Sequence, residues 1–97
     1  MRVYRHGDVI FREVKELPKG EVKELGTTFQ QHGETGKLHT LTGVKVVEVD
    51  WDGLLQTLVT TPKEGGVVTH PEHPPLVLPP STTFVVEKVR SVTPYVD

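Results

Sequence analysis

Glycine and proline divide this chain into short segments rich in β-branched residues, and this spacing constrains the fold more than any other feature. The 9 glycines and 8 prolines fall mainly between segments in which Val and Thr dominate, and Ala is absent. β-Branched side chains are stiff at χ1 and fit a pleated surface better than a helix. We therefore predict an all-β fold, a small antiparallel β-barrel or sandwich of roughly 8–10 short strands.

The chain is short enough that we expect one domain over residues 1–97. A domain of this size buries only about 60–65% of the surface that its unfolded chain exposes, so its core is thin. Without Cys, disulfides cannot add stability. Small domains without disulfides often gain stability from oligomerisation or a bound metal, and we expect a homo-oligomer.

Turn signals set the expected strand boundaries. Gly26 is expected to end one strand at 21–25 before another at 27–32, and Gly43 to separate strands at 37–41 and 44–49. Asp52-Gly53 fits a type I′ hairpin turn, and 82–92 is expected to be the longest strand.

One segment breaks the simple alternation of a strand. Val44 and Val46 share one phase, whereas Val47 and Val49 share the other. A slip of one residue in the inward-facing phase indicates a β-bulge within 44–49.

Charge and hydropathy exclude two classes of partner. The net charge is −2, and the basic residues of the first quarter alternate with glutamates, so nucleic acid is an improbable partner. No apolar run approaches the roughly 20 residues that span a bilayer, and the pattern of the first residues leads us to expect no secretory leader. We expect no membrane association.

Three of the 5 histidines suggest a metal site. His39, His70 and His73, with Glu34 or Glu72, supply the nitrogen and oxygen ligands that zinc or iron takes in sites with an open position. His70 and His73 are three residues apart beside prolines, where a turn rather than a helix would bring their rings together. A second interpretation is that these rings only hydrogen-bond backbone groups that the prolines leave without partners.

The order of several blocks resembles a family of short uncharacterised proteins of bacteria, phages and archaeal viruses. The blocks are "YRHGDVIF", "ELPKG", "HGETGKLHTL", "THPEHPPLVLPP" and "FVVEKVRSVTPY". Members resemble one another in a Gly-Glu-x-Thr-Gly-His-x-His block and a His-x-Glu-His-x-Pro-Ile-x-Leu-Pro-Pro-Gly block. The likeness to cupins is architectural only, because the order of the histidine blocks differs.

The resemblance implies that the two histidine blocks form one site. The positions it marks are Glu34, His39, His70, Glu72 and His73, with Gly7-Asp8 as a structural turn. Lys37 stands where the family has the first His of His-x-His, and a protonated Lys would repel a metal ion. Lys37 is therefore expected to pair with Glu34 or Glu72. In a second departure, Ser81 stands where the family block has the Gly that follows Pro-Pro.

Two functions follow as hypotheses. The first is a non-catalytic binding or self-assembling structural module, encoded by a virus or mobile element and found in the host cytoplasm or the virion. The second is a metal-binding protein or metal-dependent enzyme that uses His39, His70 and His73, with a divalent transition metal as its cofactor. The chain contains no Asn or Cys, and its loops are rich in proline. Both features suggest a thermophilic source.

Overall fold

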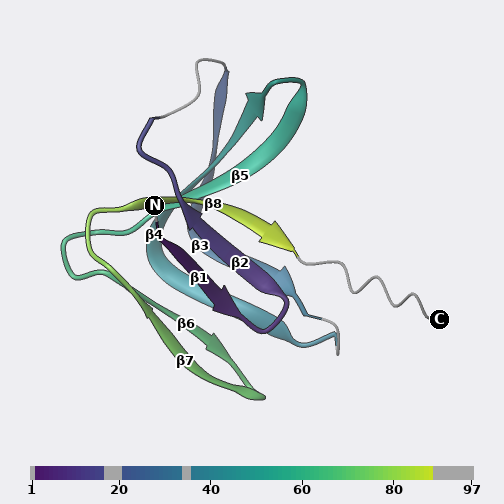
Figure 1. The fold of residues 1–97 in the computed structure, drawn as a ribbon, viewed down its shortest axis with the longest axis vertical. Coiled ribbons are helices and arrows are strands. Elements are labelled where there is room, and N and C mark those ends of the chain that lie inside the picture. The colour runs from purple at the N-terminus through teal and green to yellow at the C-terminus, as the bar shows by residue number, and fades with distance from the viewer. Residues whose placement is uncertain (1, 17–20, 34–35, 89–97) are drawn as a thin grey trace.

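The computed structural model describes residues 2–16, 21–33 and 36–88, and in these ranges the chain is all-β (Figure 1). The strands are β1 (Val3–His6), β2 (Val9–Glu13), β3 (Val22–His32), β4 (Leu38–Trp51), β5 (Leu54–Thr60), β6 (Gly66–His70), β7 (His73–Leu78) and β8 (Thr83–Lys88). Every pairing is antiparallel, which confirms the predicted fold class. None of the described ranges contains a helix able to cross a membrane.

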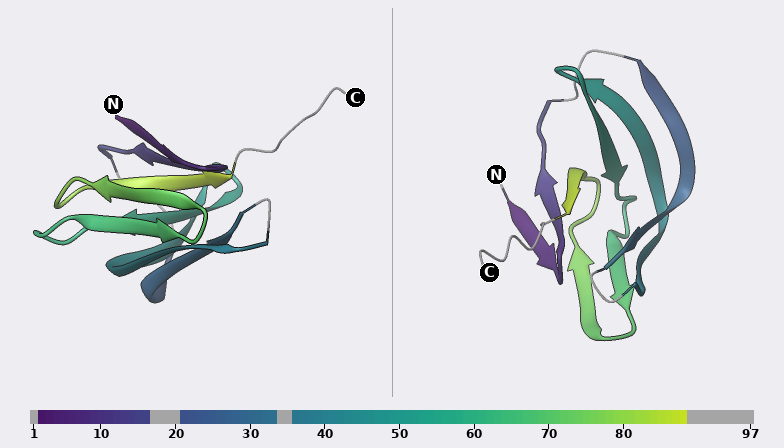
Figure 2. Two further views of the ribbon diagram at one scale, coloured as in Figure 1. Left: turned by 90° about the horizontal axis from the view of Figure 1, so that it is seen from below. Right: turned by 90° about the vertical axis from the view of Figure 1, so that its right-hand side faces the viewer.

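The strands form a nearly closed barrel in the order β1-β2-β8-β5-β4-β6-β7. The long strand β4 pairs with β3 along one edge, and its other edge pairs first with β6 and then with β5. This division of β4 lets the sheet fold over itself, as the two views in Figure 2 show. The remaining seam lies between β1 and β7, for which no backbone ladder occurs among the described residues.

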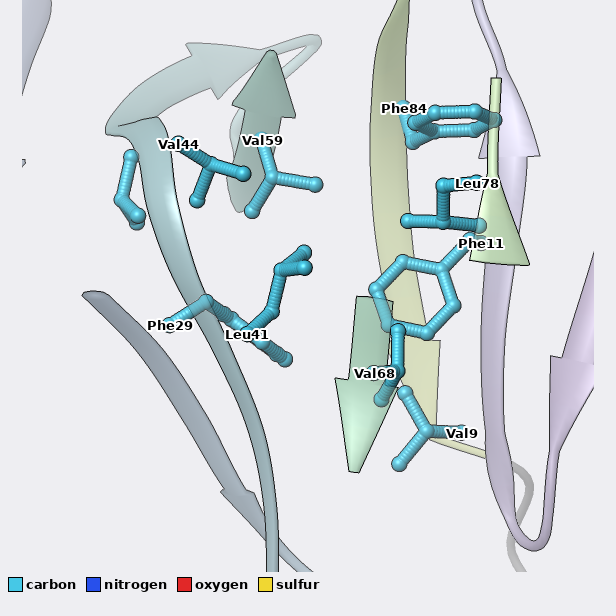
Figure 3. Close-up of a cluster of buried hydrophobic side chains, with 10 residues drawn as sticks. Val9, Phe11, Phe29, Leu41, Val44, Val59, Val68, Leu78 and Phe84 are labelled. Atoms are coloured by element: carbon cyan, nitrogen blue, oxygen red, sulfur yellow. The ribbon is translucent and has the colours of Figure 1, made fainter. Parts of the chain in front are cut away.

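The main core fills the space between the two halves of the folded sheet. Leu41, Val44 and Phe29 face Phe11 and the residues around it across this space (Figure 3). The buried cluster is completed by Val9, Val46, Val59, Val68, Leu78 and Phe84. Phe11 packs edge to face against both Phe29 and Phe84, with ring centroids 6.0 and 6.4 Å apart. Such packing favours one arrangement of the rings over others.

The phase slip in β4 has a different cause from the predicted bulge. Val46 belongs to the main core, whereas Val47 and Val49 pack with Leu58 in a second cluster on the other face. The ladder from β4 to β5 is regular from Lys45 to Trp51, so the bulge predicted within 44–49 is wrong on this side. On its other side, β4 does have register shifts, against β3 around Gly26, where Val47, Val46 and Thr42 are the successive partners on β4.

Two glycines that were expected to separate strands lie inside continuous ones. Gly43, with φ of 73°, lies within β4, and Gly26, with φ of 128°, lies within β3. Glycine allows these strands to bend without breaking, because its missing Cβ permits positive φ. The type I′ turn is confirmed, since Asp52 and Gly53 both have positive φ. Residues 89–92 of the expected longest strand lie outside the described residues, among which β4 is longest.

Candidate functional site

Three pairs of strand ends meet at one end of the barrel, at the bottom of Figure 1. They are the β1–β2 turn, the end of β3 with the start of β4, and the β6–β7 turn. A cavity of about 210 Å³ lies between them. It is lined by Arg5, Gly7, Asp8, Gly33, His39, His70, Glu72 and His73.

Four imidazole rings cluster at this end, contributed by β1, β4, β6 and β7. The ring centroids of His6, His39, His70 and His73 lie between 4.3 and 6.3 Å from one another. His70 and His73 form a directly opposite cross-strand pair, because only two residues join β6 to β7. The three-residue spacing thus brings these two rings together through a hairpin rather than a helix.

His6 and His39 form the centre of a hydrogen-bonded chain. The Nδ1 atoms of the two rings are 2.8 Å apart. His39 Nε2 lies 3.2 Å from Asp8 Oδ1, and His6 Nε2 lies 2.8 Å from the carbonyl oxygen of Pro74. Because Pro74 belongs to β7, the chain joins β1, β4 and β7 and bridges the seam of the barrel.

The two ends of this chain determine the tautomers of both rings. A carbonyl oxygen only accepts, so His6 Nε2 must donate to Pro74. An ionised Asp8 also only accepts, so His39 Nε2 donates to it. If both rings are neutral, each Nδ1 then presents a lone pair to the other. Two lone pairs 2.8 Å apart repel, and a positive centre shared between them removes the repulsion. That centre is a proton or a metal ion.

His70 is fixed in a different state. Its Nδ1 accepts a hydrogen bond of 3.0 Å from the backbone N–H of Glu72. A neutral ring that accepts at Nδ1 carries its proton on Nε2, so His70 offers a donor and not a free lone pair. His70 therefore acts in this arrangement as a brace for the β6–β7 turn.

Asp8 brings an unsatisfied carboxylate oxygen into the site. Its side chain is 9% exposed, and its Oδ2 is buried without a hydrogen-bond partner among the described residues. The nearest cation is Lys88, whose Nζ lies 3.9 Å from Oδ2, beyond hydrogen-bond distance. A buried acceptor without a donor is costly, about 1–3 kcal/mol, so this oxygen favours a ligand that supplies a donor or a positive charge.

Burial lowers the pKa of His39 below its ordinary value of 6.5. The nearby His70 and His6 lower this pKa further, and Asp8 opposes the change. Burial thus disfavours the charged form of His39.

Two glycines allow the rings to pack this closely. A Cβ at Gly7 would lie 2.9 Å from His73 Nε2 and 3.0 Å from His39 Cε1. A Cβ at Gly33 would lie 3.0 Å from His39 Nε2. Any side chain at either position would displace the imidazoles.

The structure brings together four residues of the predicted site at this cavity, His39, His70, Glu72 and His73. Lys37 Nζ lies 3.5 Å from Glu72 Oε2, and both side chains are largely exposed. Glu34 lies outside the described residues. Among the described residues, no three His, Cys, Asp or Glu side chains are already arranged around a common point that could hold a metal ion.

The sequence interpretation missed His6 and Asp8 as site residues. It assigned His6-Gly7-Asp8 to a turn, and the β1–β2 turn does occur there. The signal that could have found them is that a turn places both of its flanking polar side chains near the same end of a sheet. Nothing in the spacing indicated that this end also holds His39 and the β6–β7 turn.

Comparison with known proteins identifies the family of the chain but provides no functional information. Residues 5–88 match a family described as a domain of unknown function, DUF8820. No curated protein and no solved structure matches the chain. The matched residues include all the site residues described above and cover most of the chain. The chain therefore belongs to the DUF8820 family.

Proposed function

We propose that this protein is a non-catalytic binding module and that its ligand occupies the cavity at the histidine-rich end of the barrel. The observation that carries the proposal is the buried Oδ2 of Asp8, which lacks a hydrogen-bond partner among the described residues and lies at a cavity of about 210 Å³. That volume suits a small ligand. The carboxylate favours one that is positively charged or donates hydrogen bonds.

The rest of the site supports binding by a rigid frame. His6, His39 and His70 each use a ring nitrogen to hold other parts of the fold in place. Side chains that are already hydrogen-bonded lose less conformational entropy on binding than free side chains would. The Lys37–Glu72 ion pair is half exposed and contributes little to stability by itself.

The experiment is a calorimetric binding screen with small cations, both organic (ammonium, guanidinium) and divalent metal ions. Asp8→Asn removes the charge at constant shape and should weaken binding of any ligand that the screen detects. Asp52→Asn makes the same change at the β4–β5 turn, at the other end of the barrel (Figure 1), and should leave binding unchanged. Absence of binding to every cation, or equal affinity in Asp8→Asn, would contradict the proposal.

Self-assembly and a viral or mobile-element origin, both expected from the sequence, stay proposals. For self-assembly, the free edge of β3 is the surface that we propose. Strand β3 pairs only with β4 among the described strands, so one of its edges has free backbone groups. Its exposed side chains include Val22 and Leu25.

A further inference from the structure

We propose that the facing Nδ1 atoms of His6 and His39 bind one divalent transition metal ion, with His73 as third ligand. This inference rests on the proposed function, because it names the cation that the site takes. It differs from the ligand set expected from the sequence, since it includes His6 and excludes His70.

The first step of the argument is the support that each proposed ligand already has. Histidines that bind metals usually donate their other ring N–H to a carboxylate or a backbone carbonyl, which fixes the tautomer. His39 has such a partner in Asp8 Oδ1, and His6 has one in the Pro74 carbonyl. Both rings therefore direct Nδ1 toward the same point, where the two atoms share a proton that a metal ion can replace.

The second step compares the distances with those that a metal needs. Two bonds of about 2.0–2.1 Å at a tetrahedral angle place the ligand nitrogens roughly 3.3 Å apart. The observed separation is 2.8 Å, so the two rings must separate by roughly half an ångström. His6 lies on β1 at the seam, where no backbone ladder among the described residues ties β1 to β7. Binding of the ion therefore requires the end of β1, which is tied to β2 by the His6–Val9 pair, to shift by that amount.

The third step concerns the remaining ligands. The His73 centroid lies 5.6 Å from that of His6 and 5.9 Å from that of His39. In a tetrahedral site, imidazole centroids are roughly 5 Å apart, so rotation of the exposed His73 side chain supplies a third nitrogen. The cavity is lined by His39 and His73 and not by His6, so the ion would lie at the cavity wall, with the cavity as its entry path and as space for water in the fourth position.

The chemistry of the ligands selects the class of metal. Three imidazoles without a thiolate suit zinc, cobalt, nickel or copper rather than magnesium or calcium. The carboxylates of Asp8 and Glu72 line the same cavity as the guanidinium of Arg5, so the charged side chains around it are negative on balance and partly offset the charge of the ion. Lys37 lies 3.5 Å from Glu72 Oε2, so this cation is directed to a carboxylate.

The test is a titration of protein purified without a histidine tag with Co²⁺, followed by visible absorption, and with Zn²⁺, followed by calorimetry. We expect one ion per chain and the strong absorption of tetrahedral cobalt. His39→Gln and His6→Gln should abolish both the binding of the ion and this absorption. Asp8→Asn should weaken affinity about 10- to 100-fold, because an Asn amide can donate to Nε2 and so reverse the tautomer of His39.

Two further variants test which histidines are ligands. His70→Gln should retain affinity within a few-fold, whereas it would abolish binding if His70 were a ligand. His32→Gln, outside the cluster, should have no effect. Circular dichroism of each metal-free variant shows whether it folds. If His6→Gln does not fold, Asp8→Asn still tests the inference.

The outcomes distinguish this inference from the proposed function. If neither metal binds but an organic cation does, in a manner that depends on Asp8, the metal inference is wrong and the binding module stands. The Nδ1 atoms then share only a proton. If metal binds but His6→Gln leaves it unchanged, the ligand assignment is wrong. If no cation binds, both proposals fail.

Discussion

At the scale of single residues, Gly7 shows how tightly the site is built. It has φ of 63°, and a Cβ there would meet both His73 and His39. Gly43 has a similar φ of 73°, but a Cβ there would have nothing within 4 Å. Comparing substitutions at Gly7 and Gly43 therefore distinguishes the cost of backbone strain, which both share, from the cost of contact with the imidazoles, which only Gly7 has.

Substitution of Gly7 by Ala should destabilise the protein more than substitution of Gly43 by Ala. A non-glycine residue at positive φ costs about 1–2 kcal/mol, which both variants share. Overpacking against the rings adds about 1–3 kcal/mol at Gly7 alone. Urea unfolding of both variants measures the difference. Equal losses would mean that the rings move aside without penalty and that the cluster is loosely packed.

At the scale of elements, β3 and β4 differ most from the sequence interpretation. The sequence divides each into two strands at a glycine, but each strand continues through it. A glycine with positive φ is compatible with a turn and also with a bent strand, and only pairing with a neighbour decides between them. The bend in β4 lets it pair with β6 and β5 in turn, and this places β6 beside the start of β4, where His39 lies.

The free edge of β3 gives an element-scale prediction about assembly. Light scattering during gel filtration should show a dimer, because an exposed edge strand with apolar side chains is a template for pairing. Lysine at both Val22 and Leu25 should produce a monomer, whereas Val77→Lys on β7 should not. A wild-type monomer at high concentration would refute this interface. In that case the register shifts at Gly26 suffice to protect the edge.

At the scale of the whole molecule, the sequence predicted the fold class and the approach of two histidine blocks. Short β-branched segments between turns specify strands, and the His70–His73 hairpin follows from local spacing. His6 and Asp8 could not be placed in this way, because their approach to His39 depends on barrel closure. Closure brings β1 against β7 across 68 residues of chain, from His6 to Pro74. Such a contact leaves no periodic signal in the sequence.

The central claim is that the fold holds His6 and His39 with protonated Nε2 atoms and with their Nδ1 atoms facing each other across a shared proton that a metal ion can replace. Long-range proton–nitrogen correlation spectra of the ¹⁵N-labelled, metal-free protein, followed by addition of Zn²⁺, test it directly. We predict that Nε2 of His39 and of His6 are both protonated before and after addition, and that Zn²⁺ shifts the two Nδ1 resonances. A proton found on His39 Nδ1 with Nε2 bare, or Nδ1 resonances that Zn²⁺ leaves unmoved, would contradict the claim.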